Sequence, residues 1–86
     1  MATIDNVTIS VNGAVIATAP SGEIAPPPAA NLTVEGATWT NGQRGALNYL
    51  QRDCAVNATA LGRPFNGTYK ITGITGGFNT IKLTQL

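Results

Sequence analysis

Apolar and polar residues alternate near the start of the chain. Every second residue from Val7 to Val11 is apolar, and Asn12-Gly13 follows directly. Asn-Gly favours a two-residue type I′ turn because both central residues of that turn need a positive φ. The pattern therefore predicts a β-hairpin over residues 4–18 in which Ile9 pairs with Ile16 and one face is apolar.

A proline-rich segment follows the predicted hairpin. Residues 19–30 hold four of the five prolines of the chain, and Ile24 is their one large apolar side chain. Proline has no backbone donor and a fixed φ, which predicts an extended arm in place of a central strand or a helix. Such an arm either packs on its own domain as a surface loop or lies across a neighbouring subunit with Ile24 as the anchor. The candidate partner-binding residues are Pro20, Ile24, Pro26, Pro27 and Pro28.

The middle of the chain predicts one strand, and it does not decide whether the residues after that strand form a helix or strands. Residues 31–35 alternate as a short strand, and residues 38–40 are expected to continue it past a bulge at Gly36. Residues 43–53 have apolar residues at helical spacing, whereas residues 47–49 and 54–60 also alternate as strands do. A short helix and two strands are both compatible with this part of the chain.

The last third of the chain predicts a second hairpin. Asn66-Gly67 is expected to form a turn that opens a strand ending at Thr75, and Gly76-Gly77 a turn that leads to a last strand over 79–86. A three-residue loop that includes Phe78 pairs Ile71 with Leu83 and Gly73 with Ile81. That register places apolar residues opposite each other at the first pair.

These elements together predict the fold class. We expect one domain over residues 1–86 that is all-β and mainly antiparallel. It is either a small sandwich or a partly closed barrel, with at most one short helix and a proline-rich extended arm at residues 19–30.

Composition and charge narrow the range of partners. The chain has 86 residues, of which 10% are charged, and its net charge is +1, so it has no clustered cations that would neutralise nucleic-acid phosphates. Its apolar runs are far shorter than the ~20 residues of a membrane span. The first residues have no basic segment followed by an apolar one, so we expect a protein made in the cytoplasm and not secreted. Twelve alanines leave few large side chains for the core, which favours stabilisation by neighbouring subunits.

The residue types that carry chemistry are scarce. The chain has no histidine and one cysteine, and its carboxylates are spread along the sequence. We therefore expect no catalytic residue, no metal site and no cofactor. Cys54 is expected to be a small buried apolar residue, with pairing between chains as the alternative. The carboxylates are Asp5, Glu23, Glu35 and Asp53, and all are expected to be solvated.

Two classes of function remain. The first is a structural subunit of a larger assembly, which binds other protein subunits and forms a homo-oligomer. The second is a free-standing small β-barrel that binds a ligand through exposed aromatic side chains. We expect most of the aromatic residues to be needed in the core, which favours the first class. The aromatic residues are Trp39, Tyr49, Phe65, Tyr69 and Phe78.

In its composition and its pattern of turns, the chain resembles the small accessory structural proteins of tailed-phage virions. The resemblance rests on the Met-Ala-Thr start, the hairpins rich in Thr, Asn, Ala and Gly with Asn-Gly turns, and the arm-like segment 19–30. It implies a multi-copy virion component made in the host cytoplasm, such as a capsid decoration (cement) protein that bridges neighbouring capsid subunits. A neck or tail component is the alternative that the same resemblance implies.

Overall fold

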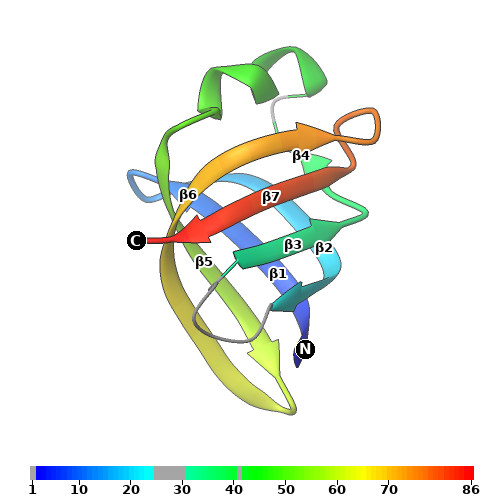
Figure 1. The fold of residues 1–86 in the computed structure, drawn as a ribbon, viewed down its shortest axis with the longest axis vertical. Coiled ribbons are helices and arrows are strands. Elements are labelled where there is room, and N and C mark those ends of the chain that lie inside the picture. The colour runs from blue at the N-terminus through cyan, green and yellow to red at the C-terminus, as the bar shows by residue number, and fades with distance from the viewer. Residues whose placement is uncertain (1, 25–30, 41) are drawn as a thin grey trace.

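The residues that the structure describes form seven strands and one short 3₁₀ helix (Figure 1). A computed structural model describes residues 2–24, 31–40 and 42–86. The elements are β1 (Ala2–Val11), β2 (Ala14–Ile24), β3 (Asn31–Glu35), β4 (Thr38–Trp39), the 3₁₀ helix η1 (Gln43–Tyr49), β5 (Asp53–Ala60), β6 (Arg63–Thr75) and β7 (Thr80–Gln85).

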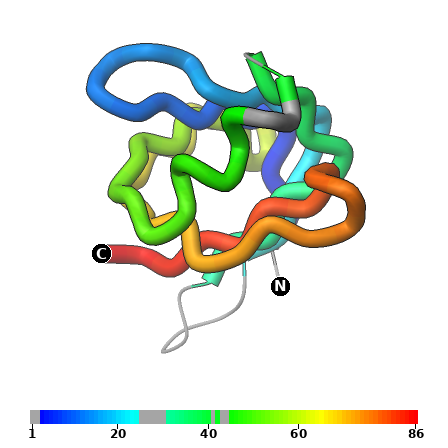
Figure 2. Tube along the Cα trace, turned by 90° about the horizontal axis from the view of Figure 1, so that it is seen from above, coloured from blue at the N-terminus to red at the C-terminus, as the bar shows by residue number. Residues whose placement is uncertain are grey.

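Six of the strands close into an antiparallel barrel. Their order is β1-β5-β6-β7-β3-β2, and β2 returns to pair with β1, while β4 adds to the edge of β2. Viewed from above, the strands surround a central core and η1 lies across one end (Figure 2). The predicted all-β antiparallel fold is confirmed. Of the two predicted architectures, a small sandwich and a partly closed barrel, the structure has the barrel, and it is closed.

The first hairpin has the predicted turn and a different register. Asn12 and Gly13 have φ values of 52° and 83°, as a type I′ turn requires. Between Ile9 and Ser10 the pairing shifts by one residue, so that Ile9 faces Ala17 and not Ile16. The bulge turns both Ile16 and Ala17 into the core, which buries more apolar surface than strict alternation would.

The predicted arm is wrong for residues 19–24. These residues continue β2, and residues 21–24 pair with both β1 and β3. Pro20 lies in a row with Asn6 and Gly36, and at this row the backbone pairing of β2 with the strands on both sides is interrupted. Proline is tolerated there because its missing backbone N–H leaves no hydrogen bond between the strands unmade. The other candidate arm residues, Pro26, Pro27 and Pro28, lie outside the described residues.

The row Asn6–Pro20–Gly36 forms a crease across three strands. Inward-facing residues of a strand normally lie two positions apart, but across the crease they lie three positions apart, as Ile4 and Val7 do in β1. Strands β3 and β4 keep one common register with β2, so Gly36 is a break in pairing and not the predicted bulge. Gly36 has a φ of 72°, and a Cβ there would lie 3.3 Å from the Pro20 ring.

The region left open over residues 43–60 contains both kinds of element. The helical alternative is correct only for η1, which ends at Tyr49, and residues 53–60 form β5 as the strand alternative predicted. Cys54 and Val56 point into the core from β5, and their neighbours along the strand are exposed. This alternation, and not the helical spacing, decides the conformation because the strand is half-buried in a barrel wall.

The turn predicted at Asn66-Gly67 is wrong. The β5–β6 hairpin turns at Leu61-Gly62, where the φ values are 51° and 76°, and Asn66-Gly67 lies within β6 opposite β5. The Tyr69 ring lies over Gly67, and a Cβ at Gly67 would be 2.6 Å from its Cε1 atom. Gly67 therefore makes room for a buried aromatic ring instead of forming a turn.

The last hairpin keeps one of its two predicted pairs. Ile71 faces Leu83 as predicted, but a bulge after Ile71 places Gly73 opposite Lys82 and not Ile81. The loop holds four residues, 76–79, and not three, because β7 begins at Thr80.

The core is made of aliphatic side chains with two aromatic rings. Trp39 and Tyr69 are buried, and Tyr49, Phe65 and Phe78 pack against the core while half-buried, as expected for a chain with few large side chains. The largest fully buried side chains are those of Ile4, Val7, Ile9, Leu32, Val34, Val56, Ile71, Ile81 and Leu83.

Candidate functional site: an uncharged face of the barrel

The outer surface of β4, β2, β1, β5 and β6 presents two rows of small uncharged side chains. The paired positions put one residue of each strand beside the next. We call this surface the neutral face. Its first row is Thr38, Thr18, Thr8, Asn57 and Asn66, and its second row is Val15, Ser10, Ala55 and Thr68.

The neutral face follows from strand alternation on a closed barrel. Ile9, Cys54 and Val56 point into the core, so the residues between them point outward. Neighbouring strands lie about 4.8 Å apart, and the row from Thr38 to Asn66 crosses five strands, about 19 Å. Its hydroxyl and amide groups can donate and accept hydrogen bonds, but they are not acids or bases near neutral pH.

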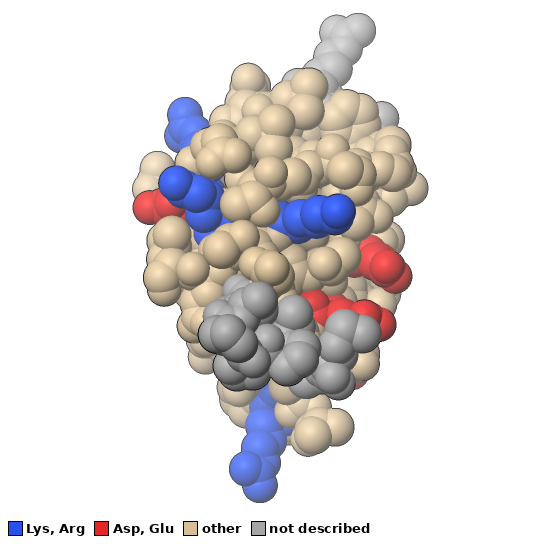
Figure 3. Space-filling view, in the orientation of Figure 1, with Lys and Arg blue, Asp and Glu red and all other residues tan. Residues whose placement is uncertain are grey.

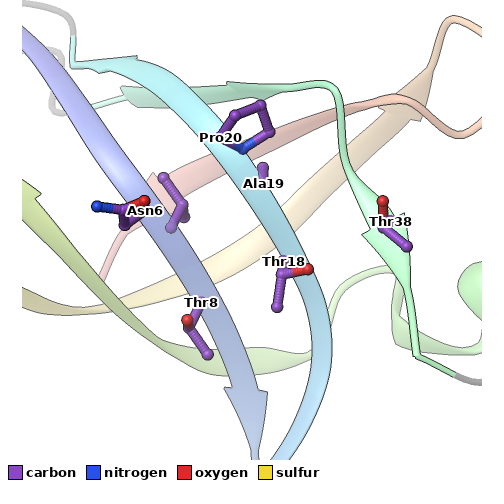
Figure 4. Close-up of a pocket in the computed structure, with 7 residues that line it drawn as sticks. Asn6, Thr8, Thr18, Ala19, Pro20 and Thr38 are labelled. Carbon is purple, nitrogen blue, oxygen red and sulfur yellow. The ribbon is translucent and has the colours of Figure 1, made fainter.

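A shallow depression of about 280 Å³ lies at one end of the neutral face (Figure 4). Thr8, Thr18 and Thr38 surround it with hydroxyl groups from three adjacent strands, and the Pro20 ring forms one wall. Asn6, Val7 and Ala19 complete the lining. The depression can therefore hold one side chain and surround it with hydrogen-bonding groups and the Pro20 ring.

The charged residues lie outside these two rows. Asp5, Glu23 and Glu35 are exposed on β1, β2 and β3, as expected for solvated carboxylates. In the view of Figure 3 most of the visible acidic groups lie at the right edge and one lies at the left edge beside basic groups, whereas basic groups also lie over the centre and the lower end. Asp5 and Glu35 flank Ser21 from its two neighbouring strands.

Of the sequence-predicted partner-binding residues, the structure describes Pro20 and Ile24, and both lie in β2 and not in an arm. Pro20 is exposed and lines the depression, whereas Ile24 is half-buried and packs against the core of its own chain. The neutral face itself was not predicted, because its rows exist only once β1 pairs with both β2 and β5.

Cys54 is buried in the barrel wall, as expected, and is a free thiol. Burial raises the pKa of the Cys54 thiol to about 11, and the nearby charge of Asp53 adds to the increase. Burial also raises the pKa of the Tyr69 phenol. Both groups therefore keep their protons at neutral pH.

We expect Cys54 to resist alkylation while the protein is folded. A pKa of about 11 in place of 9.0 lowers the thiolate fraction at pH 8 by about a hundredfold, and burial hinders access further. Mass spectrometry after iodoacetamide treatment, with and without denaturant, measures the difference. The matched control is Cys54→Ala combined with Ala55→Cys, which moves the thiol to the exposed neighbour, and equal rates for the two folded proteins would contradict the expectation.

Two further properties concern the described residues alone. Within residues 2–24, 31–40 and 42–86, no three Asp, Glu or Cys side chains are grouped so that they could hold a metal ion. In the same ranges no helix has the length and hydropathy needed to cross a bilayer.

Comparisons with protein-family models, with curated proteins and with solved structures gave no match.

Proposed function

We propose that this protein is a non-enzymatic structural subunit that packs against other protein subunits, including its own copies, through the neutral face. The observation that carries the proposal is the pair of uncharged rows, one across five neighbouring strands and the other across four of them. Short side chains such as Thr8 and Thr18 lose little conformational entropy on binding and carry no charge that would have to be desolvated. A closely packed protein contact is therefore favourable on this face.

The type of assembly follows from the resemblance described above. A multi-copy virion component agrees with a small barrel of low charge, and a capsid decoration protein that bridges neighbouring subunits uses such a face directly. A neck or tail component uses the same contact in another part of the particle. In either case the protein is made in the host cytoplasm and functions in the virion.

The alternative of a binding module with exposed aromatic side chains has less support. Trp39 and Tyr69 are buried, and Trp39 stacks on Tyr49 with ring centroids 6.2 Å apart. These rings serve packing within the chain, so they offer little free surface on which a sugar or a base would stack.

A charge placed in the neutral face is expected to weaken assembly without unfolding the protein. Thr18 is exposed, so Thr18→Lys keeps the fold and puts a solvated ammonium group into the contact, where its burial is costly. Analytical ultracentrifugation over a concentration series measures self-association, and we expect at least a tenfold weaker association constant.

The matched control is Thr75→Lys, which adds the same charge at an exposed position near the end of β6, outside the neutral face. It should associate as the wild-type protein does. A wild-type chain that stays monomeric up to the highest soluble concentration would contradict the proposed function. Equal weakening by the two variants would show that net charge, and not the neutral face, controls the association.

A further inference from the structure

The tip of the β5–β6 hairpin exposes a large apolar side chain. Leu61 is 96% exposed, the highest value for a large apolar residue among the described residues. β6 pairs with β7 from Tyr69 to Thr75, so the first part of the hairpin reaches beyond the end of β7, at the lower end of the molecule in Figure 1. The tip is therefore free to enter a partner.

The backbone at the tip disfavours leucine. Leu61 has a φ of 51°, close to the 52° that Asn12 adopts in the two-residue turn between β1 and β2. Asparagine tolerates this region, whereas a bulky side chain there is strained. Leu61 gains no packing within its own chain that would offset the strain. A contact outside the chain would supply that packing.

The depression on the neutral face has the properties of a receptor for such a tip. Its volume of about 280 Å³ can hold one side chain, which would lie against the Pro20 ring and among the polar groups that make up most of the lining. Asp5 and Glu35 lie next to it, because Asp5 precedes Asn6 and Glu35 precedes Gly36 in the crease that contains Pro20. Two exposed carboxylates therefore flank a recess whose lining is mostly polar and whose main apolar wall is the Pro20 ring.

The charge at the tip complements these carboxylates. Arg63 is exposed two residues after Leu61 and begins β6. We propose that Leu61 of one copy inserts into the depression of a second copy, where Arg63 faces Asp5 and Glu35. This inference rests on the proposed function and names the contact that assembles the copies. Because the tip and the depression are different surfaces, the contact is head-to-tail and generates a ring or a chain of copies.

The first test replaces the Leu61 side chain and keeps the turn. Leu61→Asn matches the Asn12-Gly13 turn, so we expect a fold at least as stable as the wild type and a self-association constant at least tenfold smaller in analytical ultracentrifugation. Leu47→Asn is the matched control, since Leu47 is 55% exposed on η1 and belongs neither to the hairpin tip nor to the lining of the depression. Rising salt should weaken the wild-type association because exposed ion pairs are screened.

The second test measures proximity. A mixture of Leu61→Cys and Thr18→Cys chains should form a disulfide-linked pair under mild oxidation, whereas Leu61→Cys mixed with Thr75→Cys should not. The buried Cys54 stays out of this reaction.

The outcomes separate the two proposals. If the wild-type chain associates and Leu61→Asn associates equally, or if no Leu61–Thr18 cross-link forms, the tip contact is overturned and the proposed function stands. A cross-link together with loss of association in Leu61→Asn supports both. If Leu61→Asn weakens binding to a different protein while self-association is unchanged, a second copy is not the occupant.

Discussion

Replacing Ile9 by alanine is expected to lower the free energy of unfolding by about 2–4 kcal/mol. Ile9 is 0% exposed and lies in β1 between Ala17 of β2 and Val56 of β5, so the removed atoms leave a cavity at the closure of the barrel. A domain of this size is stable by about 5–15 kcal/mol in total, so the loss is a large fraction. Urea unfolding followed by circular dichroism measures it as a lower midpoint.

Thr3→Ala is the control for Ile9→Ala because Thr3 is exposed in the same strand. It should change the free energy of unfolding by about 0.5 kcal/mol or less. A wild-type midpoint for Ile9→Ala would mean that the pairing of β1 with β2 and β5 is not as described.

The largest effect is expected for Trp39. Trp39→Ala should cost about 3–5 kcal/mol, because the ring is 8% exposed, stacks on Tyr49 and donates a hydrogen bond from Nε1 to the carbonyl oxygen of Phe78 at 2.8 Å. One side chain thereby connects β4, η1 and the loop before β7. Thermal and urea unfolding by far-ultraviolet circular dichroism are suitable, since the variant lacks the only tryptophan of the chain.

Trp39→Phe separates the hydrogen bond from the packing. It keeps an aromatic ring and loses the donor, so we expect a cost of about 1–3 kcal/mol, smaller than that of Trp39→Ala. Equal costs for the two variants would show that the hydrogen bond to Phe78 and the loop it holds, and not the buried ring, account for the effect.

Local signals predicted structure where several of them agreed. At Asn12-Gly13 the turn dipeptide and the alternation on both sides indicate the same hairpin, and the turn is correct. Asn66-Gly67 is the same dipeptide, yet it lies in a strand, because its glycine accommodates the ring of Tyr69. The hairpin turns at Leu61-Gly62 instead, which carries no asparagine signal, although the alternation of residues 54–60 ends there.

The arm and the site depended on contacts between distant residues. Proline usually excludes a central strand, and Pro20 is accepted only because Asn6 and Gly36, 14 and 16 residues away along the chain, lie beside it in the crease. The rows of the neutral face likewise require bulges that shift the register by one residue. No local pattern shows where such bulges fall, so the all-β class could be predicted and the surface could not.

The crease also constrains how the chain can change in length. Deleting Asn6, Pro20 or Gly36 alone would restore simple alternation in one strand and leave that strand out of phase with its partners in the crease, with core residues turned to solvent. Removing all three residues together would keep the three strands in phase with one another and shorten each of them by one residue. Insertions and deletions at these three distant positions are therefore coupled, and a change tolerated at one of them requires the same change at the other two.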